Sequence, residues 1–340
     1  MAGDVLELIA QTISDYKTLK TASEQDVLAH VEQWSAGFWK YCDDSWFGEA
    51  EHAILLEAVL AALRVGYFSE EHCSEMLDCV LEESPGDQLP PLKDPCWSWL
   101  RCPQDGGSQN ELVARLGKHD VVGDGKHFVY LDDGVFSGDT LKKDLRAWLH
   151  DEAPTEAVLT TVHFFVNNDH YCKAIKELEA DLERKDCRLE PNAFLFLAES
   201  LDSDSNWDDE LALRLFPTQE MFESDHLASY RKRDDNARRR HVGLQLPHDV
   251  PEDDLLGGPH HRYVLTRAFL EVGAKLIMQV RQPAWRLAPL GYTDRPSLGL
   301  GALVATFRNC PNNAPMALWY EVPGKDLWHP LLPRHDKPIA

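Results

Sequence analysis

The sequence has no uninterrupted apolar stretch near the length of about 18 residues that a membrane-crossing helix requires. Its N-terminus also lacks the basic segment of a secretory signal, because Asp4, Glu7 and Asp15 lie in the first amphipathic stretch. Neither a membrane span nor an export signal is therefore expected. We predict a soluble, cytoplasmic protein with no membrane partner.

Cysteines at metal-ligand spacing are missing as well. The eight cysteines form no CxxC pair and have no matching pair of histidines (Cys42, Cys73, Cys79, Cys96, Cys102, Cys172, Cys187 and Cys310). Neither a zinc site nor a disulfide framework is indicated. We expect reduced thiols, most of them buried.

Basic residues are few. The chain has 34 Lys and Arg against 57 Asp and Glu, a net charge of -23. This charge argues against non-specific binding along nucleic-acid phosphates, which requires basic side chains. Residues 231–240 are an exception, with six cations in ten residues. These cations either contact a nucleic acid or a partner, or lie in solvent beside Asp234 and Asp235.

The 340 residues suffice for two domains, and a hydrophobic content of 44% with ten Trp supports a sizeable core. Over residues 1–117 the pattern is mostly helical. Apolar residues recur every three or four positions from Val5 to Leu19, and residues 54–65 are apolar nearly all round. Ser69 offers an N-cap for a further helix, and the Pro- and Gly-rich residues 85–107 predict a connector. We therefore predict a helical N-terminal region over residues 1–117.

From about residue 127 the period changes. Apolar runs at residues 128–131, 158–166 and 194–197 predict strands, and helical patterns at 139–150 and 170–185 separate them. Strands alternating with helices are typical of a parallel sheet. We predict an α/β domain over residues 118–340 with a polar insertion around 199–260. A helix over 263–275 follows, and strands at 276–280 and 302–307 are expected to extend the sheet.

The segment from His127 to Leu141 carries the most chemistry. Four apolar residues run into Asp132 and Asp133, so a buried strand is predicted to end in paired carboxylates, with Gly134 next. In an open α/β sheet, ligands bind beyond the carboxyl ends of the strands. Two adjacent carboxylates need donors, and a ribose diol, alone or with Mg²⁺, supplies them. We therefore predict a diol site, with Mg²⁺ as the cofactor and Asp132 and Asp133 as its candidate ligands.

A turn with small residues follows and opens a predicted helix. Ser137, Gly138, Asp139 and Thr140 precede a helical pattern, and N-terminal N–H groups of a helix have no intrahelical partner. With the positive end of the helix dipole, these groups and the hydroxyls of Ser137 and Thr140 suit a phosphate. The alternative is a plain Asp-Asp-Gly turn with Ser137 as an ordinary helix cap.

The order of strand, acidic pair, small-residue turn and helix resembles the ribose-phosphate motif of the type I phosphoribosyltransferases. The match covers residues 128–131, Asp132 with Asp133, and residues 137–140. The resemblance implies that the aspartates hold the ribose hydroxyls and that the turn holds the 5-phosphate. It also implies a type I phosphoribosyltransferase-like parallel-sheet core behind the helical N-terminal region. Asp139 departs from the motif, because a small residue is commoner there.

A wider resemblance covers most of the chain. Residues 130–138, the helical region before them, and the segments at 290–292 and 299–319 look like the phosphoribosyltransferase-like family of bacterial conflict systems. This resemblance implies an effector in anti-phage defence, sometimes encoded beside retron-type elements. A defence-system protein or a nucleic-acid-containing partner is then a candidate besides the small-molecule ligand.

Two further segments are secondary candidates. The Gly-Gly-Ser turn ending at Ser108 either binds pyrophosphate or only caps a helix, and it contains no Lys or Arg. After the last predicted strand, Arg308 could bind phosphate, and Asn309, Asn312 and Asn313 could read a base. Ordinary Asx turns explain the same asparagines. Cys310 has no neighbouring base that would make it a nucleophile.

Two functions fit these patterns, and a purely structural helical scaffold is a third possibility, which would apply if no nucleotide raised the melting temperature. The first is an enzyme that binds 5-phosphoribosyl pyrophosphate or a nucleotide and makes or breaks the bond at ribose C1, with catalytic Asp132 and Asp133. The second is a nucleotide-sensing module that regulates a protein partner without catalysis. Asp139 and the uncharged upstream loop favour the second.

Overall fold

The computed structural model of the protein describes residues 2–82, 97–99, 127–135, 138–151, 156–166, 168–183, 188–195, 213–218, 220–221, 227–230, 232, 255–280, 283–284, 286–292, 298–321 and 328–334. The chain divides into two compact units. Unit 1 is Met1–Ser69 with Trp207–Ala340, and unit 2 is Glu70–Asn206. Both ends of the chain thus share a unit, whereas the sequence suggested a helical region separate from the rest. The domain boundary predicted at residues 117 and 118 lies outside the described residues and stays a prediction.

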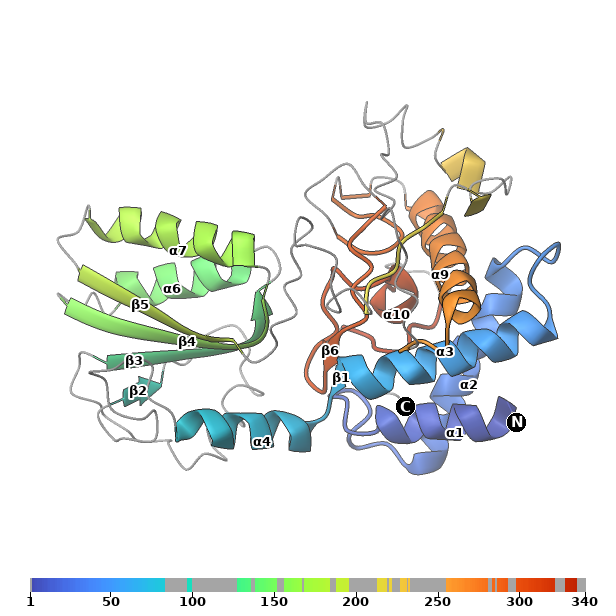
Figure 1. Ribbon diagram of the computed structural model, residues 1–340, viewed down its shortest axis with the longest axis horizontal. Coiled ribbons are helices and arrows are strands. Elements are labelled where there is room, and N and C mark those ends of the chain that lie inside the picture. The colour runs from blue at the N-terminus through green and yellow to red at the C-terminus, as the bar shows by residue number, and fades with distance from the viewer. Residues whose placement is uncertain are drawn as a thin grey trace. The chain divides into compact units, whose positions relative to one another are not determined.

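Unit 2 contains a parallel sheet of four strands in the order β2-β3-β4-β5. The strands are β2 (Trp97–Trp99), β3 (His127–Val135), β4 (Glu156–Val166) and β5 (Arg188–Leu195). Helix α6 (Asp139–Asp151) connects β3 to β4, and α7 (Asn168–Glu183) connects β4 to β5. Both helices cover one face of the sheet (Figure 1). The predicted mixed α/β fold with a parallel sheet is therefore confirmed, and β2 lies in the segment that we had predicted to be a connector.

The apolar runs of β3 and β4 explain why they lie at the centre of this sheet. Strands covered by helices must be apolar over most of their length. One face of β3 and β4 packs against α6 and α7 in a single cluster of buried side chains. The cluster consists of Phe128, Tyr130, Val135, Leu141, Leu145, Leu149, Leu159, Val166, Tyr171, Ala174, Ile175 and Leu178. The site described below lies at the polar end of this cluster.

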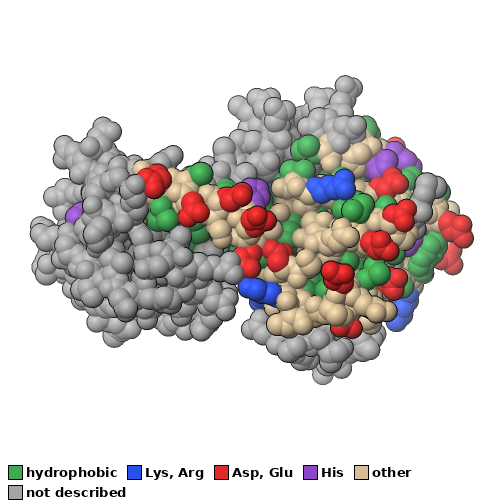
Figure 2. Space-filling model, turned by 90° about the horizontal axis from the view of Figure 1, so that it is seen from below, with side chains coloured by type: hydrophobic (Ala, Val, Ile, Leu, Met, Phe, Trp, Pro, Cys, Tyr) green, Lys and Arg blue, Asp and Glu red, His purple; other side chains and the backbone are tan. Residues whose placement is uncertain are grey.

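Helix α4 (Glu70–Leu81) begins directly after Ser69, as the sequence predicts, and belongs to unit 2. Cys73, Leu77 and Val80 are buried on one side of the helix. The other side exposes Glu71, Glu75 and Asp78, and α4 contains no Lys or Arg. Figure 2 shows acidic side chains along this helix. Its exposed face is therefore unsuited to contact with a nucleic-acid backbone.

Unit 1 is built on packed helices. They are α1 (Ala2–Thr12), α2 (Glu24–Tyr41), α3 (Glu49–Gly66), α9 (Pro259–Gln279) and the short α10 (Met316–Trp319). Ser23 caps α2, since it accepts from the Asp26 backbone while Asp26 bonds back to it in a capping box. Helix α9 packs against α2, α3 and α10, which accounts for its many buried residues (Figure 1). Among the described residues, no helix combines the length and the hydropathy needed to cross a bilayer.

Two strand predictions in unit 1 were wrong. One of the segments is part of a helix, and the other contains a strand that pairs in a different sheet. Residues 276–279 are the last turn of α9 and Val280 is its C-cap, because a short apolar run does not distinguish a strand from a buried helix. Within residues 302–307, only β6 (Ala305–Thr306) is a strand. It pairs in parallel with β1 (Tyr67–Phe68) in a separate two-stranded sheet, and so it does not extend the sheet of unit 2.

Part of the predicted insertion at residues 199–260 belongs to the core of unit 1. Leu213 and Leu215 are buried, and the Leu213 carbonyl accepts from the Leu303 backbone at 2.7 Å. The carbonyl of Arg214 accepts from the Arg262 guanidinium at 2.7 Å. The acidic run at residues 202–210 and most of the basic segment at 231–240 lie outside the described residues.

Candidate functional site

The predicted acidic pair lies within β3, not after its end. We expected this strand to stop at Leu131, but its pairing with β4 continues through Asp132, Gly134 and Val135. The reason is the partner strand, whose apolar run extends to Val166 and supplies ladder partners for Asp132, Gly134 and Val135. Asp133 is part of the strand backbone. Asp132 therefore lies in the paired part of the strand, close to its end at Val135.

Asp132 lies on the face of the sheet that α6 and α7 cover. Side chains two residues apart in a strand share a face. Phe128 contacts Trp148 of α6, with ring centroids 4.7 Å apart, and the Tyr130 hydroxyl contacts Asp144 of α6. Asp132 follows in the same alternation and is half-buried. Its carboxylate is therefore held where the end of the sheet meets the helix layer.

Three polar side chains meet at this point. The Tyr130 hydroxyl lies 3.1 Å from Oδ2 of Asp144 and 3.4 Å from Oδ2 of Asp132. Tyr130 is 1% exposed and Asp144 6% exposed. Sequence reasoning missed both roles, because Tyr130 was counted only as an apolar strand residue and Asp144 only as a helix residue. The sequence feature that could have revealed the contact is a tyrosine two positions before the first aspartate, because such residues share a face of the strand.

His163 of β4 lies directly opposite Asp132 in the parallel ladder. It is fully buried, between the rings of Tyr130 and Tyr171 at centroid distances of 6.0 and 5.8 Å. Burial lowers the pKa of His163 to about 3, and the neighbouring backbone of Asp132 opposes this shift only in part. The ring is therefore neutral at neutral pH and supplies no positive charge to Asp132.

Helix α6 begins at Asp139, as the helical pattern of residues 139–150 predicts. Ser137 lies outside the described residues, and Gly138 precedes the helix with a φ of 72°. A Cβ atom at Gly138 would lie 3.0 Å from the Ala174 Cβ and 3.0 Å from the His170 carbonyl. Glycine is thus required here for packing against α7 as well as for the left-handed backbone. The backbone N–H of Lys142 closes the first turn of α6 by donating to the Gly138 carbonyl at 3.0 Å.

Asp139, the departure from the expected motif, is exposed and paired. Its Oδ1 lies 3.2 Å from Nζ of Lys142, which also lies 3.3 Å from Oε2 of Glu177. Burial alone would lower the pKa of Lys142, but hydrogen bonds with Asp139 and Glu177 outweigh this and raise it. Lys142 is thus charged and offsets part of the negative charge beside the helix start. Thr140 is also exposed, in the first turn of α6.

Ser108 is outside the described residues, and Arg308, Asn309 and Asn312 belong to unit 1. Arg308 is 4% exposed, and the Asn309 backbone donates to the Thr306 hydroxyl at 3.1 Å. Burial raises the pKa of Cys310 to about 12, so this cysteine is an inert core thiol. The Asn309 backbone thus takes part in a turn, and the binding roles expected for Arg308, Asn309 and Asn312 stay predictions.

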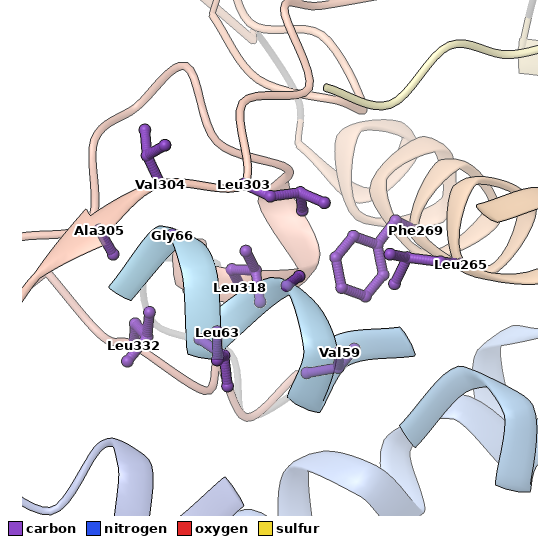
Figure 3. A pocket seen from close by; sticks show the side chains of 11 residues that line it. Val59, Leu63, Gly66, Leu265, Phe269, Leu303, Val304, Ala305, Leu318 and Leu332 are labelled. Carbon is purple, nitrogen blue, oxygen red and sulfur yellow. The ribbon is translucent and has the colours of Figure 1, made fainter. Parts of the chain in front are cut away.

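Unit 1 contains a small apolar cavity. Its lining includes Val59, Leu63, Phe269, Leu303, Leu318 and Leu332 (Figure 3). It has room for about a single water molecule, and its walls offer almost no polar surface to hold one. The cavity is therefore a packing gap and not a ligand site.

A magnesium ion, if one is bound, needs partners beyond the described side chains. No group of three or more His, Cys, Asp or Glu in the described ranges could hold a metal ion. Asp132 offers one carboxylate, and Mg²⁺ in nucleotide sites is usually bound by one or two carboxylates with substrate phosphates and water. The residues present therefore fit an ion that arrives with a phosphorylated ligand. They do not form a complete cage.

Comparison of the chain with curated proteins and with solved structures returned no match. A sequence model of the PRTase-CE family, in contrast, matches residues 31–334. This match includes the whole of β3, the turn and α6, and most of both units. The chain therefore belongs to the PRTase-CE family, which is phosphoribosyltransferase-like.

Proposed function

We propose that this protein binds the 5-phosphoribosyl group of 5-phosphoribosyl pyrophosphate or of a nucleotide, at the C-terminal end of β3 and the start of α6. The main support is the position of Asp132, near the end of a central parallel strand that leads through a glycine turn into a helix. Ligands of open parallel sheets bind at this edge.

The two halves of the site suit the two halves of the ligand. The ribose hydroxyls donate to the carboxylates of Asp132 and Asp133, which have only acceptor oxygens. The 5-phosphate accepts hydrogen bonds from backbone N–H groups at the start of α6 and from Ser137 and Thr140. Gly134 keeps the end of the strand free of side-chain bulk beside the ligand.

Chemistry at ribose C1 passes through a transition state with positive charge on the ring. Asp132 and Asp133 would position the ribose and stabilise this charge, so the protein contributes mainly geometry and electrostatics. Bound Mg²⁺ would neutralise the departing pyrophosphate or phosphate. The resulting reaction is pentosyl transfer or hydrolysis of an N-glycosidic bond.

A second candidate is a nucleotide-sensing module that regulates a protein partner. One observation favours it: Arg308, which was expected to bind phosphate, is buried and only 4% exposed. A protein that keeps the ribose-phosphate half of the site can bind a ligand without turning it over.

The experiment is ligand binding with turnover measured in parallel. The protein is mixed with Mg²⁺ and 5-phosphoribosyl pyrophosphate, with and without nucleobases as acceptors, and separately with nucleotides. Its melting temperature and the release of pyrophosphate or of a base are recorded. Because a ligand specific for the folded state must stabilise it, we expect a rise in melting temperature that Asp132→Asn with Asp133→Asn abolishes. A rise in melting temperature with no release of pyrophosphate or base under any of these conditions supports the sensing module. No rise for the wild type, or global unfolding of the double variant, contradicts the proposed site.

The role in anti-phage defence rests on the resemblance of the sequence to conflict-system proteins. Under this proposal the protein is a cytoplasmic effector that acts with a defence-system protein or a nucleic-acid-containing partner. Phage plating on cells that carry the native gene with its neighbours, against the same genes with Asp132→Asn, tests it. Equal plating on the two strains would contradict a defence role that depends on this site.

A further inference from the structure

Tyr130 is placed so that one hydroxyl group touches both a candidate ligand-binding carboxylate and a buried one. Its oxygen lies 3.4 Å from Asp132 and 3.1 Å from Asp144. The ring is anchored in the core cluster between the sheet and the two helices and is 1% exposed. The hydroxyl is therefore a fixed point beside the Asp132 side chain.

Asp144 accounts for the fixed position of this hydroxyl. Its carboxylate is 6% exposed, and its Oδ1 has no hydrogen-bond partner within the described part of the chain. Burying a carboxylate is costly unless its oxygens accept hydrogen bonds. The contact with Tyr130 is the one such bond that the described residues give to Asp144, so its loss would leave Asp144 unsatisfied.

The two contacts differ in length, and this difference matters. A tyrosine hydroxyl has one hydrogen and can donate fully to only one carboxylate at a time. The shorter contact identifies Asp144 as the main acceptor in the structure described here. The contact with Asp132 is long for an O–H···O hydrogen bond, and contacts of this kind often tighten when a ligand binds.

We propose that Tyr130, held in place by Asp144, is a positioning residue that fixes the Asp132 carboxylate for the ribose diol. The inference rests on the proposed phosphoribosyl site and adds to it a residue on the strand and a residue on α6. Tyr130 restrains Asp132 to the side-chain conformation that faces the start of α6. A ligand then binds a carboxylate that is already ordered, which reduces the entropy cost of binding.

The same core supplies a matched control. The Tyr171 hydroxyl lies 2.8 Å from Oγ1 of Thr161, a hydrogen bond between two buried side chains. Tyr171→Phe therefore removes a buried tyrosine hydroxyl from the same cluster without removing a group that touches Asp132. Both Tyr→Phe changes should lower the melting temperature by similar amounts, since each deletes one buried hydroxyl.

The test uses ribose 5-phosphate and 2-deoxyribose 5-phosphate as probes, each with Mg²⁺, by isothermal titration calorimetry. We expect Tyr130→Phe to weaken ribose 5-phosphate binding by roughly tenfold, the effect of one hydrogen bond to a charged group. The deoxy sugar, which lacks one hydroxyl of the diol, should lose less, so discrimination between the two probes falls. Tyr171→Phe should change neither affinity more than about twofold, within the range of remote substitutions.

Two further variants separate positioning from packing. Asp144→Asn keeps an oxygen that accepts from Tyr130 and should bind close to the wild type, whereas Asp144→Leu should behave like Tyr130→Phe. Adding Tyr130→Phe to Asp132→Asn should cause no further loss, because the two residues act as one unit.

The outcomes distinguish the two proposals. If the wild type binds ribose 5-phosphate and Tyr130→Phe binds it equally well, the positioning role is wrong and the proposed function stands. An equal loss in Tyr171→Phe, or full additivity with Asp132→Asn, also overturns the positioning role. If the wild type binds neither ribose 5-phosphate nor 5-phosphoribosyl pyrophosphate, the proposed function fails and this inference fails with it. If Tyr130→Phe does not fold, the two Asp144 variants test the positioning role instead. Weaker binding by Asp144→Leu than by Asp144→Asn supports it, and equal binding overturns it.

Discussion

The indole nitrogen of Trp46 lies 2.9 Å from Oε1 of Glu271, a glutamate of α9 with no exposed surface. The other carboxylate oxygen accepts from the Asp43 backbone at 3.0 Å. Arg267 completes the group, because its guanidinium stacks over the Trp46 ring at 4.2 Å and approaches Glu271. Glu271 thus joins the loop after α2 to the central helix of unit 1.

This arrangement predicts that Glu271→Ala destabilises unit 1 by about 3 kcal/mol, since two partly buried donors lose their acceptor. Glu271→Gln keeps one acceptor oxygen and should cost less. Thermal unfolding followed by tryptophan fluorescence measures both. Glu57→Gln is the control, because Glu57 is an exposed partner of His261 and should have no measurable effect. Equal stability of Glu271→Ala and the wild type would contradict a structural role for this contact.

His30 predicts a pH dependence in unit 1. Its Nε2 lies 2.8 Å from the Leu331 carbonyl and its Nδ1 lies 2.6 Å from Nε2 of His329. Burial lowers the pKa of His30 to about 4, although the bond to Leu331 opposes the shift. Between pH about 6.5 and 4 the unfolded chain binds a proton that the folded chain does not, so stability falls as the pH falls.

Each such proton contributes a slope of about 1.4 kcal/mol per pH unit within this window. His30→Gln keeps a donor for the Leu331 carbonyl and removes the titration, so we expect a flatter dependence of the unfolding free energy on pH. Denaturant unfolding at several pH values measures this slope. An unchanged slope in His30→Gln would show that other groups control the acid sensitivity.

Replacing Gly138 should lower the stability of the protein at the start of α6. Gly138→Ala places a Cβ on a backbone with φ of 72° and 3.0 Å from Ala174. The left-handed conformation alone costs an L-residue about 1–2 kcal/mol, and the contact adds to it. We expect a lower melting temperature that Ala174→Gly partly restores in the double variant. Gly3→Ala, where a Cβ meets no atom within 4 Å, is the control and should not destabilise.

Removing the charge of Asp139 should raise the affinity for 5-phosphoribosyl pyrophosphate. Its carboxylate lies in the first turn of α6, where the proposed site holds a phosphate, and Lys142 offsets only part of its charge. Asp139→Ser removes the repulsion and keeps a residue suited to a helix start, so 5-phosphoribosyl pyrophosphate should bind several-fold more tightly at low salt. Titration calorimetry at two salt concentrations tests this. Glu177→Gln removes a charge from the same ion-pair group but from α7, and should have less effect.

Strands β3 and β4 and helices α6 and α7 could be predicted because their patterns are local. The run from Phe128 to Leu131 is apolar, and the helix signal of residues 139–150 is strongly periodic. The extension of β3 to Val135 could not be predicted from these residues, because it depends on how far β4 continues beside it. The strand predicted at residues 276–280 was wrong, because an apolar run of this length also fits the end of a helix that is buried on all sides.

The candidate site was predicted in outline only. The acidic pair and the small-residue turn form a contiguous motif, so sequence alone identified them. Tyr130 and Asp144 are 14 positions apart, and they meet only because α6 packs back onto β3. His163 faces Asp132 through the register of two strands, which no local pattern specifies. The type I core, the ligand and the magnesium ion stay predictions.

The discontinuity of unit 1 also bears on how the protein is made. Tyr67 pairs with Ala305, and α3 packs on α9, so partners in this unit are separated by the whole of unit 2. During translation the first helices leave the ribosome long before their counterparts exist, whereas unit 2 is one unbroken segment and can close first. Nascent chains stalled before residue 259 should therefore hold α1, α2 and α3 in a protease-sensitive state, with the sheet of unit 2 already protected.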